Sequence, residues 1–141
     1  MSKINQIQDA LRQLDGGPFQ KLADAYLVEK GLGPVNSIGS VIGADKTRPG
    51  TPDTLVTTSE KKYVFAEYTT QQQDLLKKLR SDLDKCFDEA KTGVPVDRIE
   101  RVILCFNAKL KAADEPELLE ICQARGVNLD LFGIGALAFN L

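Results

Sequence analysis

The spacing of hydrophobic residues predicts two helices at the start of the chain. Ile4, Ile7, Leu11 and Leu14 recur at the spacing of one helical face, so an amphipathic helix is expected over roughly 3–14. A second helix should begin near Pro18, because proline is favoured at the first helical position, and should end at a glycine cap. Its buried face is formed by five apolar residues: Phe19, Leu22, Ala23, Tyr26 and Leu27.

The pattern then changes to that of strands. Three strands are predicted, over 32–43, 51–57 and 62–70, and the polar turn at 58–61 makes a hairpin of the last two. Side chains alternate along a strand, so the third strand should present two different faces. One face is expected to carry Tyr63, Phe65, Glu67, Thr69 and Gln71, and the other Val64, Ala66 and Tyr68.

The second half of the chain alternates between helical and strand patterns. Helices are predicted over 71–91 and 114–126, strands over 101–109 and 127–132, and a short closing helix over 133–141. An antiparallel hairpin followed by two strand–helix–strand crossovers implies an α/β fold with a mixed sheet and helices on both faces. Residues 1–141 are expected to form one domain, since the length suits a single core.

Composition narrows the chemistry. The chain has no histidine, which excludes Ser-His-Asp hydrolases and zinc sites built on histidine, so a metal would be held by oxygen ligands. Its three cysteines fit small buried hydrophobes better than a disulfide framework. No apolar run is long enough to span a membrane and the start lacks a signal-peptide core, so we expect a cytoplasmic protein. The net charge of −2 means that nucleic-acid binding would need a local basic patch.

Two carboxylates on the predicted hairpin are the strongest chemical signal. Asp53 begins one strand and Glu67 lies at the middle of the next, so both can reach one hard cation such as Mg²⁺ or Mn²⁺. A carboxylate within an otherwise apolar strand must face solvent, pair with a cation or bind a metal. The alternatives are that Asp53 is a turn residue, that Thr69 is an ordinary strand former, and that Gln20 is a surface amide.

The order of elements, with Pro52-Asp53 on one strand and Glu67-x-Thr69 on the next, resembles the PD-(D/E)XK restriction-endonuclease-like superfamily. Gly50, three residues before Asp53, is similar to the Mrr-like branch, in which Gln20 would match a site residue on the first core helix. The chain also resembles N-terminal effector domains of bacterial NACHT or STAND defence ATPases. The resemblance implies that Asp53 and Glu67 bind Mg²⁺ or Mn²⁺, with the backbone carbonyl of Tyr68 as a further ligand.

One departure affects the catalytic expectation. The family has a lysine two residues after the glutamate, and this chain has Thr69 at that position. A lysine elsewhere in the chain could take its place, and Lys46, Lys62 and Lys77 are the candidates for such a migrated lysine. Gln71 and Gln20 are candidates for positioning water.

The resemblance therefore implies a metal-dependent endonuclease acting on DNA, expected to be double-stranded, as an effector in anti-phage defence. It implies a homodimer or higher oligomer, and a larger ATPase or sensor region in the full-length chain. Basic residues flanking the hairpin are expected to contact phosphates: Lys46, Arg48, Lys62 and Lys77. The alternative function is a catalytically silent module with the nuclease fold, used for nucleic-acid binding or oligomerisation.

Overall fold

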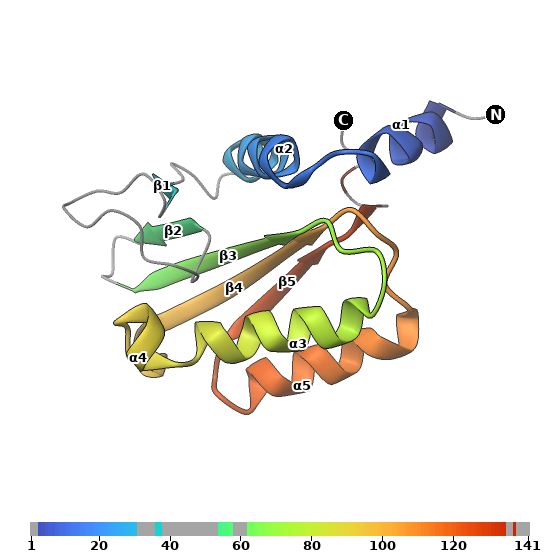
Figure 1. Cartoon of the computed structure of the whole chain (residues 1–141). Coiled ribbons are helices and arrows are strands. Elements are labelled where there is room, and N and C mark those ends of the chain that lie inside the picture. The colour runs from blue at the N-terminus through green and yellow to red at the C-terminus, as the bar shows by residue number, and fades with distance from the viewer. Residues whose placement is uncertain (1–2, 31–35, 38–53, 58–61, 135–136, 138–141) are drawn as a thin grey trace.

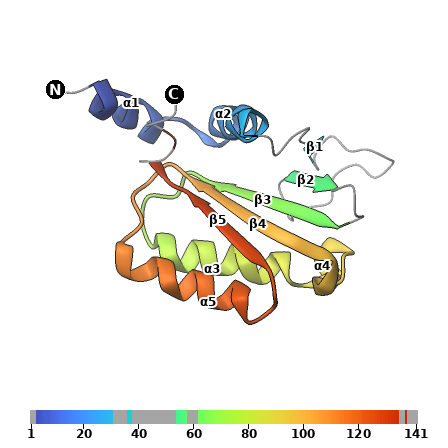
Figure 2. The same ribbon diagram turned by 180° about the vertical axis from the view of Figure 1, so that it is seen from behind.

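The fold is a mixed sheet between two layers of helices (Figure 1). The computed structural model describes residues 3–30, 36–37, 54–57, 62–134 and 137. Helices α1 (Lys3–Arg12) and α2 (Gly16–Glu29) lie on one face of the sheet, and α3 (Leu75–Cys86) and α5 (Glu115–Gln123) lie on the other, as the view from behind in Figure 2 also shows. The α/β class with helices on both faces is confirmed.

The described strands form one five-stranded sheet in chain order. They are β1 (Asn36–Ser37), β2 (Thr54–Thr57), β3 (Tyr63–Thr69), β4 (Ile99–Phe106) and β5 (Asn128–Phe132). The pairs β1–β2 and β2–β3 are antiparallel, whereas the pairs β3–β4 and β4–β5 are parallel. The mixed sheet therefore follows the predicted order of a hairpin and then two crossovers.

Each face of the sheet packs its own apolar core. Phe65 on β3 joins residues of α3 and α5, while Val64 and Ala66 join residues of α1 and α2. The predicted division of β3 into two faces is confirmed, because neighbouring side chains of a strand point to opposite sides. Both layers of helices are thus anchored on this strand, which also carries Glu67.

Some predicted boundaries are wrong. The helix expected over 71–91 begins at Leu75 and stops at Cys86, and a separate short helix, α4 (Glu89–Thr92), follows it. The break has a local cause: the Asp88 carboxylate accepts a hydrogen bond from the Ala90 amide at 3.0 Å and starts the new helix. Gly93 then ends α4 in the left-handed conformation, at φ 74°.

The other differences are smaller. Three-residue 3₁₀ turns, Val96–Arg98 and Ala112–Asp114, lead into β4 and α5, and β4 begins two residues earlier than expected. Of the strand predicted over 32–43 the structure describes only Asn36–Ser37, and most of the closing helix predicted over 133–141 lies outside the described residues. Within the described part of the chain, every helix is too short or too polar to cross a membrane.

Candidate functional site

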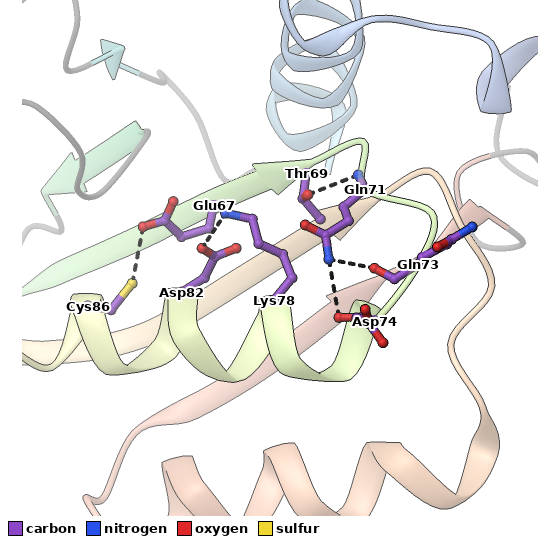
Figure 3. A network of polar contacts seen from close by, with 8 residues as sticks. All are labelled: Glu67, Thr69, Gln71, Gln73, Asp74, Lys78, Asp82 and Cys86. Carbon is purple, nitrogen blue, oxygen red and sulfur yellow. Dashed lines mark hydrogen bonds and ion pairs between the residues drawn. The ribbon is translucent and has the colours of Figure 1, made fainter.

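Glu67 is held in a buried position between β3 and α3. Its side chain faces α3 and is only 4% exposed, and the preceding residues on this face, Tyr63 and Phe65, belong to the apolar core. The thiol of Cys86 on α3 donates a hydrogen bond to the Glu67 Oε1 atom over 3.6 Å (Figure 3). A buried carboxylate is costly unless it is hydrogen-bonded, paired with a cation or bound to a metal, and a thiol is only a weak donor.

A second buried carboxylate lies beside it with a lysine. The Lys78 amine forms an ion pair with Asp82 at 2.9 Å, and Asp82 is 3% exposed. Lys78, Asp82 and Cys86 follow one another at helical i, i+4 spacing on α3, so they form a polar stripe that faces β3 and Glu67 (Figure 3). We call Glu67, Lys78, Asp82 and Cys86 the buried polar cluster.

The Lys78 side chain also opens onto a surface hollow. This hollow has a volume of about 240 Å³ and is lined by residues of the start of α2, the end of β3 and α3, among them Gln20, Thr69 and Lys78. Two expected site residues, Gln20 and Thr69, are therefore brought together from separate elements. Lys78 connects them with the buried polar cluster.

Tyr68 points to the opposite side of the sheet. Its hydroxyl donates a hydrogen bond to the Asp24 carboxylate on α2. The backbone carbonyl of Thr69 accepts a hydrogen bond from the backbone N–H of Asn107, the residue after β4, so it points toward β4. Successive carbonyls of a strand point to opposite edges. The Tyr68 carbonyl, expected as a metal ligand, therefore points toward the β2 edge.

Gln71 does not lie where it was predicted. The strand β3 ends at Thr69, so Gln71 is in the loop before α3 and not on the strand face of Glu67. Its side-chain amide donates hydrogen bonds to the backbone carbonyls of Gln73 and Asp74, at 2.5 and 3.2 Å (Figure 3). Gln71 thus fixes the entry into α3, where Asp74 adopts the left-handed φ of 53°.

Asp53 lies outside the described residues, as do Lys46 and Arg48. The neighbouring register is nevertheless defined: Thr54, which follows Asp53 in the sequence, pairs with Ala66, which precedes Glu67. Within the described residues, no three or more cysteine and acidic side chains are grouped so that they could hold a metal ion.

Lys78, which the structure places in the cluster beside Glu67, was not among the candidates for a migrated lysine. Lys62 is exposed at the opposite end of β3, and Lys77 is exposed and lines a different hollow. The sequence signal for Lys78 was present, because Lys78, Asp82 and Cys86 share a helical stripe beside the apolar face of α3. Periodicity did not show which strand this stripe would face.

The cysteine thiols outside the cluster are not reactive groups. Burial raises the pKa of Cys105 far above its usual range, and the nearby Asp24 carboxylate raises it further. Burial raises the pKa of Cys122 to about 11, against the opposing effect of Arg125. Both thiols therefore stay protonated near neutral pH, which makes them poor nucleophiles and poor metal ligands.

Comparison with known proteins finds no family model that matches the chain and no curated protein that matches it. The interpretation of the site therefore depends on the residues and their geometry.

Proposed function

We propose that the chain is a metal-dependent endonuclease domain with a restriction-endonuclease-like fold. The observation that carries the proposal is the position of Glu67: a buried carboxylate on β3, next to the residue that pairs with Thr54, with the Lys78 amine on the facing helix. The element order from α2 to β4, an antiparallel hairpin followed by a parallel strand, supports the same proposal.

The available donors suit a hard cation. Glu67, Asp53 and the Tyr68 carbonyl would hold Mg²⁺ or Mn²⁺, since such ions prefer oxygen ligands and this chain has no histidine. When bound there, the ion would polarise the scissile phosphodiester and make water a stronger nucleophile. The Tyr68 carbonyl is directed toward β2, and Asp53 immediately precedes Thr54, the first residue of β2, in the sequence.

Lys78 takes the role that the family gives to the lysine at the position of Thr69. Its ammonium, oriented by Asp82, stabilises the negative charge that grows on the phosphate during attack by water. In that step a new phosphorus–oxygen bond forms to water and the bond to the leaving sugar oxygen breaks, with protons exchanged with solvent. Gln20 and the Thr69 hydroxyl, which line the same hollow as Lys78, hold water or a phosphate oxygen by hydrogen bonds.

Double-stranded DNA is the proposed substrate, and each chain supplies one site, so cutting both strands calls for a dimer or higher oligomer. A role as the effector of an anti-phage defence ATPase is the corresponding biological proposal.

The proposal is tested with plasmid DNA in Mg²⁺ and then Mn²⁺. Nicking or linearisation should be lost in Glu67→Gln and reduced by about a hundredfold in Lys78→Met, as for other groups that stabilise transition-state charge. Lys91→Met is the matched control, because it removes an exposed lysine of α4 that lines neither hollow. Cleavage by Glu67→Gln at the parental rate would contradict the assignment.

A catalytically silent module is the second candidate, favoured by Thr69 in the place of the family lysine. Titration calorimetry with Mn²⁺ separates the two functions. Heat of binding that disappears in Glu67→Gln supports the nuclease, whereas absence of binding to either protein supports the silent module.

A further inference from the structure

A second hollow lies beyond the carboxyl ends of β3 and β4. It has a volume of about 480 Å³ and is formed by the first turns of α3 and the segment between β4 and α5. In open α/β sheets, ligands bind preferentially at the carboxyl ends of the strands. We call it the basic hollow, because four cationic side chains line it: Lys77, Arg80, Lys109 and Lys111.

The charge of the basic hollow differs from that of the whole chain. Its four cations face two acidic residues, Asp74 and Asp114, whereas the protein as a whole carries a net charge of −2. Arg80 also contacts Glu117 at 3.6 Å, but both side chains are about half exposed, so this pair is weak. Among the described residues, none of the ion pairs involves the three lysines, all of which are exposed.

We infer that the basic hollow binds the phosphodiester backbone of nucleic acid. Lysine and arginine side chains make the phosphate contacts that supply sequence-independent affinity. Aromatic side chains, on which bases would stack, are lacking among the described residues that line the hollow. The hollow therefore offers charge to a backbone but, among the described residues, no aromatic surface on which a base would stack.

Proximity to the candidate catalytic site favours nucleic acid over an acidic protein. Lys77 lines the basic hollow and the next residue, Lys78, lines the 240 Å³ hollow, so the first turn of α3 contributes a lysine to each hollow. A strand held in the basic hollow would lead toward the buried polar cluster. The choice of nucleic acid as the polyanion rests on the proposed function, whereas the existence of the basic hollow does not.

The test measures binding without cleavage. Fluorescence anisotropy of a labelled DNA duplex in EDTA compares the Lys109→Ala/Lys111→Ala protein with a Lys21→Ala/Lys91→Ala control. The control removes two exposed lysines from helices away from the basic hollow: α2, on the other face of the sheet, and α4, at the other end of α3. The two proteins have the same net charge. The hollow variant should bind at least about tenfold more weakly, and its slope of log K against log salt should fall by about 1.8, since each lost phosphate contact removes about 0.9.

Equal binding and equal salt slopes for the two double variants would overturn the inference, and so would the absence of DNA binding by the parental protein. Polyglutamate that competes with DNA at equal charge concentration would point to an acidic protein partner and also overturn it. Because EDTA prevents metal-dependent cleavage, the outcome is independent of the plasmid assay. A protein that binds through the basic hollow but never cuts would support this inference while refuting the nuclease.

Discussion

Removing the Lys78 amine separates the structural role of the buried polar cluster from its catalytic role. Lys78→Met keeps the length of the side chain but leaves the Asp82 carboxylate, which is 3% exposed, without the partner now 2.9 Å away. Breaking a buried ion pair costs about 3–5 kcal/mol when both groups are fully buried. Lys78 is 31% exposed, so we expect a smaller loss of about 2–3 kcal/mol in the free energy of unfolding.

A second variant should recover that loss. Lys78→Met/Asp82→Leu removes both charges together, and replacing a buried pair by apolar residues of similar volume is often neutral or stabilising. Urea unfolding measures both proteins, and thermal unfolding should show the single variant melting roughly 5–10 °C lower. The surface pair Arg12–Asp9, also 2.9 Å long but with both side chains well exposed, is the matched control. Arg12→Met should cost less than about 1 kcal/mol.

Activity should respond differently from stability. If the Lys78 ammonium stabilises the transition state, the Lys78→Met/Asp82→Leu protein will be as stable as the parent and will still cleave DNA about a hundredfold more slowly. The reasoning about the ion pair fails if Lys78→Met unfolds at the same urea concentration as Arg12→Met, or if the double variant is no more stable than the single. Parental cleavage by a stable double variant would remove Lys78 from the mechanism.

Two further predictions concern the core. Asn107 is fully buried and its side-chain amide donates a hydrogen bond to the Leu11 backbone carbonyl at 2.8 Å. Asn107→Ala should therefore lower the free energy of unfolding, measured in urea, by about 1–3 kcal/mol. An unchanged urea midpoint would contradict this role. The raised pKa values of Cys105 and Cys122 mean that the free energy of unfolding is highest below about pH 8.5 and falls as the pH rises toward about 11, because over this range only the unfolded chain releases the thiol protons. Urea midpoints that do not change with pH over this range would refute the prediction. So would a Cys122→Ala protein whose midpoint falls as steeply with pH as that of the parent.

The sequence pattern was sufficient for the strand that organises the site. Along β3, side chains alternate with a fixed period of two, so the placement of Phe65 and Glu67 on one face and Val64 and Ala66 on the other followed from the residues alone. The helices α2 and α5 were likewise evident from their apolar spacing. Such local periodicities depend on backbone geometry, which is the same in every fold.

Boundaries were less predictable because side-chain hydrogen bonds decide them. The Gln71 amide contacts the carbonyls of Gln73 and Asp74 and delays the start of α3, and the Asp88 cap divides the predicted helix in two. Both contacts compete with helix continuation at positions where the hydrophobic spacing alone would allow it.

A mixed α/β fold, two faces for β3 and a carboxylate on that strand could all be predicted from the residues. What faces the carboxylate could not: Lys78 and Asp82 belong to a different element, and packing of α3 on β3 brings their polar stripe beside it. The tertiary structure also brought Gln20 and Thr69 onto one hollow with Lys78, and gathered cations from α3 and the segment after β4 into another. The reason is that periodicity specifies which face of an element is buried, while the partner of that face is set by how whole elements pack.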